Sequence, residues 1–341
     1  MGVVTQRGKM PHRTVAVLLL VTALVGGLAW TREIGAEAKI ARIGVLASFQ
    51  IGSKEPVPAR WWEPFRRTLA EDGWIEGKTV SFEFQSAFAD PPHLAEAAFE
   101  IVRHNVDVIW AVGAPFTRAA HAASSTVPIV AIDFTTDPVA EGYAENFGRP
   151  GRNITGIFLD APQFAGKWLE VLKLTVPGLL RIAVMWDPSP GRAHLNGVQS
   201  VARELGLEVE VAEVHKPEDI DRAFSAFRRR PQALVILPSP MLFVQSSRLA
   251  KLALKHRLPA TSMTPYLFAE AGGLIGYGPD DAATVERSAV FIAKILRGAN
   301  PGHLPLERPS KFDFVLNLKT AKALGLTVPE SVLVRADKVI R

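Results

Sequence analysis

The 341-residue chain contains no cysteine. No disulfide framework can therefore form, whichever compartment the protein occupies. The absence also excludes a lipid-modified cysteine behind a cleaved leader. Without such links, the folded protein must be stabilised by its hydrophobic core alone.

Motifs of the common enzyme classes are missing as well. No Gly-x-Ser-x-Gly nucleophile elbow occurs, and the glycines of 272–278 come in the wrong order for a dinucleotide fingerprint. Segment 151–156 has the glycine spacing of a P-loop, but Ile157 and Phe158 stand where lysine and a hydroxyl are required. The eight histidines form no pair at i, i+4, which leaves metal catalysis without a ligand set. We expect no catalytic residue, no metal and no cofactor.

Neither sign of charge dominates the chain. It has 39 basic and 34 acidic residues, a formal charge of +5, and its only dense basic run is 228–230. That run falls at the end of a predicted helix, where positive side chains interact favourably with the helix dipole. We therefore expect no nucleic-acid partner.

The N-terminal segment differs in kind from the rest. Basic residues between 7 and 13 precede an unbroken apolar run over 15–29, and Ala-Glu-Ala follows at 36–38. This order is typical of a secretory signal peptide. The run is shorter than the roughly 20 apolar residues of a membrane span. We predict a signal peptide over 1–38 and export to the periplasm or another extracytoplasmic space; the alternative is an uncleaved membrane anchor.

After this segment, short apolar runs typical of buried strands alternate with amphipathic segments typical of helices. In the first half, strands are predicted at 41–48, 79–84, 106–112 and 129–134, and helices at 61–72, 91–104 and 115–124. In the second half, strands are predicted at 181–186, 207–214, 233–237, 259–262 and 274–277, and helices at 163–176, 192–205, 217–229, 241–256 and 280–297. A tail with a strand at 312–316 and a helix at 318–324 packs on these units. The pattern predicts an α/β fold with two Rossmann-like lobes, each a parallel sheet covered by helices, bridged by 133–188.

Several predicted strands end in polar or aromatic, turn-forming residues. In open parallel sheets, ligands bind outside the carboxyl ends of the strands. Aromatic faces, hydroxyls and a few carboxylates at that edge suit a small-molecule site. The candidate ligand-binding residues are Ser48, Phe49, Ala114, Phe116, Thr117, Thr135, Trp186, Asp187, Ser239 and Tyr277.

The mature chain also resembles a known family. The segments FRRTLAEDGWIEGKTVSFEF, VPIVAIDFTTDPV, RPGRNITGI, EAGGLIGYGPD and the tail from Lys311 are similar, in order and spacing, to exported substrate-binding proteins of ABC transporters of the tryptophan-binding-like type. The resemblance implies a type I periplasmic-binding fold, in which two lobes joined by three crossovers close on a ligand. It also implies an ABC permease in the membrane as the partner.

The crossovers that the resemblance implies fall near 154–159, 276–279 and 301–309. One lobe would then comprise 39–156 and 279–300, and the other 157–278 and 301–341. Family members that resemble amino-acid binders carry an acidic or amide residue after the strand matched by 235–238, but here Ser239 and Pro240 follow. The resemblance thus leaves the ligand open.

From these observations we predict a monomeric binding protein that captures a small, partly apolar solute between its lobes and makes or breaks no bond. Two alternatives remain. One is a ligand-sensing domain tethered to the membrane by the uncleaved apolar run. The other is an enzyme on the same scaffold.

Overall fold

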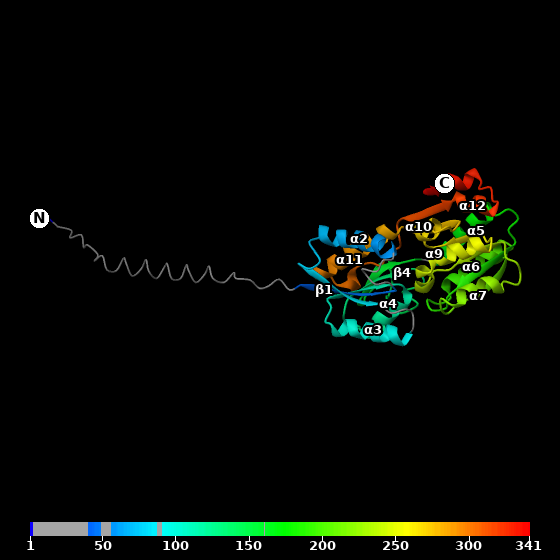
Figure 1. Cartoon of the computed structure of the whole chain (residues 1–341). Helices are drawn as coiled ribbons and strands as arrows, with labels where there is room; N and C mark the ends of the chain where they lie inside the picture. Colours follow the sequence, from blue (N-terminus) through cyan, green and yellow to red (C-terminus); the bar gives the residue numbers. More distant parts are fainter. Residues whose placement is uncertain (3–39, 49–55, 87–90, 160) are drawn as a thin grey trace. The chain divides into compact units, whose positions relative to one another are not determined.

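The computed structural model describes residues 1–2, 40–48, 56–86, 91–159 and 161–341 (Figure 1). The predicted apolar run over 15–29 and the candidate Phe49 lie outside the described residues. Among the residues that are described, no helix combines the length and apolar character needed to cross a membrane. Residues 41–341 form one compact unit.

The first sheet is built from the first half of the chain, and all its strands are parallel. Their order across the sheet is β2 (Val80–Ser86), β1 (Ala41–Ala47), β3 (Val108–Val112), β4 (Ile129–Asp133) and β5 (Ile154–Phe158). Every residue of β3, β4 and β5 is buried, which is typical of strands covered on both faces. The covering helices are α2 (Pro56–Glu71) and α11 (Asp281–Leu296) on one face, and α3 (Pro91–Arg103) and α4 (Ala114–Ala123) on the other.

The second sheet has seven strands, and only the pairing of its β10 and β11 is antiparallel. Their order is β12 (Lys338–Ile340), β11 (Phe312–Asn317), β10 (Ile275–Pro279), β9 (Ala260–Ser262), β8 (Ala233–Ile236), β6 (Arg181–Trp186) and β7 (Glu208–Glu213). One face packs against α5 (Ala161–Thr175) and α6 (Ala193–Glu204); the other packs against α7 (Asp219–Ala226), α8 (Pro240–Val244), α9 (Ser246–Lys255) and α10 (Pro265–Glu270). The tail adds the 3₁₀ turn η1 (Pro301–His303) and the helices α12 (Leu318–Leu324) and α13 (Glu330–Leu333).

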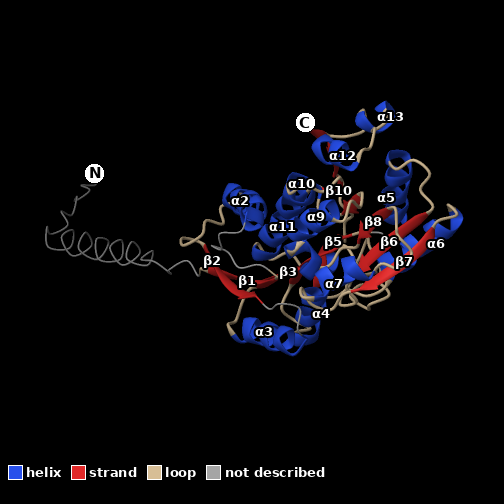
Figure 2. Ribbon diagram, turned by 45° about the vertical axis from the view of Figure 1, so that its right-hand side comes forward, coloured by secondary structure: helices blue, strands red, loops and turns tan. Residues whose placement is uncertain are grey.

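The chain passes between the two sheets three times (Figure 2). It first leaves β5 for α5 and the second sheet, then returns from β10 to α11, which packs against α2. Before the last passage to β11, the backbone N–H of Phe158 donates to Glu307 O at 2.8 Å, and Glu307 N–H donates to Gly156 O at 2.9 Å. These bonds tie the third connection to the edge strand β5.

The predicted alternation of strands and helices is confirmed, with local differences. The helix predicted over 241–256 is two helices separated at Gln245, and β5, α10, α13 and β12 were not predicted. Gly156 weakens the strand pattern of β5, yet the strand needs it. Its φ is +139°, and an added Cβ would lie 2.1 Å from the carbonyl oxygen of Ala131 on β4.

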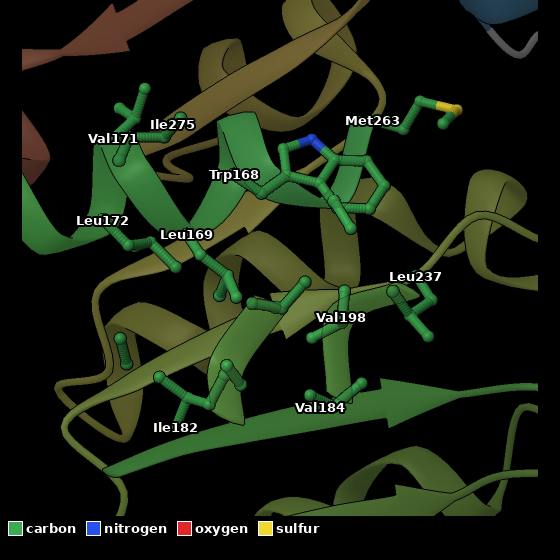
Figure 3. Close-up of a cluster of buried hydrophobic side chains, with 14 of the residues drawn as sticks. Trp168, Leu169, Val171, Leu172, Ile182, Val184, Val198, Leu237, Met263 and Ile275 are labelled. Atoms are coloured by element: carbon green, nitrogen blue, oxygen red, sulfur yellow. The ribbon is translucent and has the colours of Figure 1, made fainter. Parts of the chain in front are cut away.

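The largest hydrophobic cluster lies between the second sheet and α5 and α6. Figure 3 shows Trp168 of α5 above Val184 of the sheet and Val198 of α6. The Trp168 indole N–H, which would otherwise be an unpaired donor in this core, donates to Tyr277 O at 2.9 Å. Met263 and Leu237 lie in the same cluster and also reach the pocket described next.

Candidate functional site

A pocket of about 100 Å³ lies where the carboxyl edges of the two sheets meet. From the first sheet, residues that follow β1, β3 and β4 line it: Ser48, Gly113, Ala114, Phe134 and Thr135. From the second sheet, residues at and after the ends of β8, β9 and β10 line it: Leu237, Pro238, Ser239, Pro240, Met263, Thr264 and Pro279. The loops at the carboxyl ends of both sheets therefore converge on one cavity, at the edge where open parallel sheets bind ligands.

The walls of the pocket are mainly apolar. Trp61 of α2 and Phe243 of α8 meet edge to face with ring centroids 5.4 Å apart, so a helix of each sheet contributes one aromatic wall. Edge-to-face contacts of this kind are favourable beyond the area they bury. Neither ring was predicted to lie at the site, because both are on helices rather than directly after strands.

Gly113 brings the two sheets close together. Its φ is +104°, and an added Cβ would lie 3.1 Å from Pro240 Cγ at the start of α8. The residue before α4 therefore needs a backbone conformation that glycine adopts freely. This conformation starts α4 directly beneath the pocket.

A buried carboxylate fixes the loop after β4. Asp133 accepts bonds from the backbone N–H of Thr135 at 2.9 Å and of Thr136 at 3.2 Å, and both hydroxyls donate to it as well. Burial raises the Asp133 pKa, and these four donors oppose the rise. The network places Thr135 at the pocket but already uses its hydroxyl proton.

Among the described residues that line the pocket, Asp281 is the only charged side chain. Burial raises its pKa to about 7, while a hydrogen bond from the Trp61 side chain acts in the opposite direction. Its neighbour Asp280 has a different role, since its Oδ1 accepts the N–H of Ala283 at 2.9 Å and caps α11. Asp280 therefore serves as the N-cap. Sequence reasoning missed Asp281, although two consecutive acids at the start of a predicted helix, of which only one can cap it, were an available signal.

Four of the candidate residues line the pocket: Ser48, Ala114, Thr135 and Ser239. Ser239 also caps α8, because its Oγ accepts the N–H of Leu242 at 3.0 Å. A hydroxyl that accepts from the backbone still has its proton to donate. Contact of these residues with a ligand stays a prediction.

Phe116 and Thr117 point away from the pocket. Phe116 is fully buried among the hydrophobic residues between the first sheet and α3 and α4. The Thr117 hydroxyl donates to Gly113 O at 3.1 Å, within its own helix. Both come soon after β3. Because they lie in the first turn of α4, however, their side chains do not reach the cavity that Gly113 and Ala114 line.

Trp186 and Asp187 also lie outside the pocket lining. The Trp186 indole N–H donates to Gly191 O at 3.0 Å, and the guanidinium of Arg192 stacks 4.7 Å from its ring. Asp187 accepts from the backbone N–H and hydroxyl of Ser189 at 2.9 and 3.0 Å. Both residues thus organise the turn after β6.

Tyr277 lies in the middle of β10 and packs among aromatic rings. It stacks on Phe164 with centroids 5.1 Å apart and meets Phe314 edge to face at 6.1 Å. The next-but-one residue, Pro279, is the part of β10 that reaches the pocket.

Direct contacts close the space between the two sheets around the pocket. Arg60 of α2 pairs with Glu270 of α10 at 2.6 Å and lies 4.9 Å from the ring of Tyr266. Beside the pocket, His194 Nε2 lies 2.5 Å from the carbonyl oxygen of Phe134. Burial lowers the His194 pKa to about 4, so the ring is neutral at pH 7 and donates through Nε2–H.

Within the described part of the chain, no group of three or more histidine, aspartate or glutamate side chains is placed to hold a metal ion. What the site offers is an apolar cavity, hydroxyls on its rim and one carboxylate. Such a surface can enclose a small solute of mixed polarity.

The chain is similar to known proteins over most of its length. A tyrosine-binding protein of Clostridioides difficile (strain R20291) is 24% identical over 267 residues, which cover 77% of this chain and 75% of that protein. The structure of an ABC domain in complex with L-Trp from Streptococcus pneumonia is 22% identical, with a TM-score of 0.78 over 88% of this chain and 99% of the other. A conserved domain protein from Vibrio cholerae O1 biovar eltor is 25% identical, also with a TM-score of 0.78, over 88% of this chain and 100% of the other.

Two mostly parallel sheets with interleaved helices also make up solved periplasmic binding proteins of type I, which confirms the predicted fold. The family model described as ABC transporter substrate binding protein matches residues 60–340. Because this match spans most of the chain, the protein belongs to the family of ABC transporter substrate-binding proteins.

Proposed function

We propose that this chain is the exported substrate-binding component of an ABC import system. It captures a small, partly apolar solute between its two sheets and presents it to a membrane permease, acting as a monomer. The observation that carries this proposal is the position of the pocket, whose walls come from the carboxyl edges of both sheets. A solute held there contacts both halves of the molecule at once.

In this proposal, residues 39–156 and 279–300 form one lobe, and 157–278 and 301–341 form the other. The packing of α11 against α2 supports the return of the chain to the first lobe after β10. Three connections between lobes act as the hinge. Because the solute touches both lobes only when they are closed, its binding shifts the population toward the closed state.

The chemistry of the pocket supports an aromatic or branched apolar solute. Trp61, Phe243 and Met263 offer apolar contact area, and the rim hydroxyls fix orientation. The relative named for tyrosine and the solved structure in complex with L-Trp also support a solute of about this size that contains an aromatic ring. Residues 1–38 act as the cleaved export signal.

Thermal-shift screening tests the proposal. Aromatic and branched amines, amino acids and carboxylic acids are added to the chain, and a true ligand raises the free energy of unfolding by about 2.7 kcal/mol at 100 times its dissociation constant. No shift with any member of the panel would contradict binding of this class of solute.

Two half-buried phenylalanines of the second lobe provide a matched pair of variants. Phe243 lines the pocket, whereas Phe227 packs beside α7 away from it. We expect Phe243→Ala to weaken binding of the best ligand about tenfold or more, because an apolar wall is lost, and Phe227→Ala to leave it unchanged. Calorimetric titration of both variants measures this; equal dissociation constants would place the solute elsewhere.

A further inference from the structure

We propose that Asp281 binds a positively charged nitrogen of the solute, so that the ligand is a small apolar compound carrying a protonated amine. This inference rests on the proposed function and names the chemical class that the same pocket selects. It assigns Asp281 as a ligand-binding residue.

The residues of the described chain that line the pocket carry one negative charge and no positive charge to balance it. Among its described lining residues there is one carboxylate and no lysine, arginine or histidine. Enclosing an ionised carboxylate beside apolar walls is costly unless a positive charge accompanies it. A protonated amine supplies that charge, whereas a carboxylate on the solute at this place would repel Asp281.

Helix α11 does not need the Asp281 carboxylate as its cap. Asp280 already accepts the N–H of Ala283 and also pairs with Lys311. Asp281 stands in the first helical turn, where the helix dipole favours its ionised form, and its side chain faces the cavity. Its carboxylate is therefore available to a ligand.

Two aromatic side chains line the pocket together with the Asp281 carboxylate. The Trp61 side chain hydrogen-bonds to Asp281 and lines the same cavity, with Phe243 at its edge. An ammonium group near Asp281 would also lie close to aromatic rings, which stabilise cations that reach their faces when water is excluded. Carboxylate and rings together form a site for an apolar amine.

The charges around Asp281 do not replace such a ligand. The positive charge of Arg60 on α2 lowers the Asp281 pKa, but Arg60 is already paired with Glu270 and lies over the ring of Tyr266. The negative charges of Asp280, the N-cap of α11, and of Asp313 on β11 raise the Asp281 pKa. With burial, they raise the Asp281 pKa to about 7, so an arriving ammonium group would hold the carboxylate ionised.

Matched pairs of solutes test the proposal on the unaltered full chain. In each pair an ethylamine tail is replaced by a propionate tail: tryptamine with indole-3-propionate, tyramine with 3-(4-hydroxyphenyl)propionate, and isopentylamine with 4-methylpentanoate. Calorimetric titration at pH 7.5 should show at least one amine binding tenfold or more tightly than its acid. An acid that binds as tightly as its amine overturns the inference and leaves the proposed function standing. If none of the six binds, the inference is overturned, while the proposed function is judged by the wider thermal-shift panel.

Variants then assign the effect to Asp281. We expect Asp281→Asn to weaken binding of the best amine about 30-fold or more, because a buried charge loses its partner. Glu286→Gln, on the same helix but outside the pocket lining, should leave affinity unchanged. In the unaltered chain the affinity should also fall about tenfold per pH unit below 7, a slope that Asp281→Asn removes. Unchanged affinity in Asp281→Asn, or a pH slope that survives it, refutes the assignment.

Discussion

At the scale of single residues, His194 shows how one buried side chain joins the two halves of the molecule. It stands on α6 of the second sheet, and its Nε2 reaches the carbonyl oxygen of Phe134, which follows β4 of the first. The other ring nitrogen, Nδ1, is buried and has no hydrogen-bond partner among the residues that the structure describes. Protonation would therefore place an unpaired N–H and a charge in the interior, which is why the pKa falls to about 4.

This lowered pKa predicts a loss of stability in acid. The unfolded chain takes up a proton at His194 near pH 6.5 and the folded chain only near pH 4, so stability falls as the pH drops between these values. Asp281, whose folded pKa is raised to about 7, contributes with the opposite sign over all of this range. The contribution of His194 is therefore measured as the difference in stability loss between the unaltered chain and a variant without this histidine.

The comparison uses His194→Gln, whose amide can still donate to Phe134 O but does not titrate. Between pH 7 and 4.5 the unaltered chain should lose about 2 kcal/mol more of its unfolding free energy than the variant does. Urea unfolding at both pH values measures this. Equal losses would mean that His194 is protonated in the folded protein.

At the scale of elements, β10 needs two glycines because neighbouring backbone lies directly against it. An added Cβ at Gly278 would lie 1.9 Å from Met263 O, and one at Gly276 would lie 2.2 Å from Pro265 O. The segment from β9 to α10 thus packs directly on the backbone of β10. These are the glycines whose order does not fit a nucleotide site; close backbone approach explains them instead.

Gly278→Ala should therefore destabilise the protein by about 3 kcal/mol or more, since the clash is with backbone that cannot move alone. Gly166→Ala is the matched control, because Gly166 lies in α5 with open space around it. A helix interior favours alanine over glycine by about 1 kcal/mol, so this variant should be neutral or stabilised. Thermal unfolding of the two variants distinguishes them, and an equal effect of both substitutions would contradict the close approach at β10.

At the scale of the whole molecule, contacts around the pocket connect the two sheets. Arg60 reaches Glu270 and Tyr266, Trp61 meets Phe243, and Arg118 on α4 lies 3.4 Å from Ser189 O. The Arg60–Glu270 pair is partly exposed, so it contributes at most about 1 kcal/mol. In the proposed hinge closure, that amount can change the ratio of open to closed molecules up to about fivefold.

Reversing one charge should shift this ratio. Arg60→Glu faces Glu270 with a like charge, and we expect small-angle scattering to show a larger radius of gyration than for the unaltered chain. Arg66→Glu is the control on the same helix, because Arg66 pairs only with Glu63 and Glu76 among the described ion pairs, within the first half of the chain. If both variants scatter alike, the Arg60 contact does not hold the lobes together.

The sequence predicted the site in part. Strand ends located Ser48, Ala114, Thr135 and Ser239, because the carboxyl ends of parallel strands share one edge of a sheet. The same rule placed Phe116, Trp186 and Tyr277 there, although the turn after a strand decides which side chain enters the cavity and which enters the core. Trp61, Phe243 and Asp281 were missed because they come from helices.

The sequence by itself determined most of the parallel strands in the two sheets, most of their covering helices and the family, because hydrophobic periodicity and motifs are read from short stretches of the chain. Only the tertiary structure decided that the two edges meet, that Trp61 and Phe243 touch beside the cavity, and that Asp281 faces it. Trp61 lies 182 positions before Phe243 and 220 positions before Asp281 in the chain. Their contacts depend on how the chain crosses between the sheets, which no short stretch of sequence encodes.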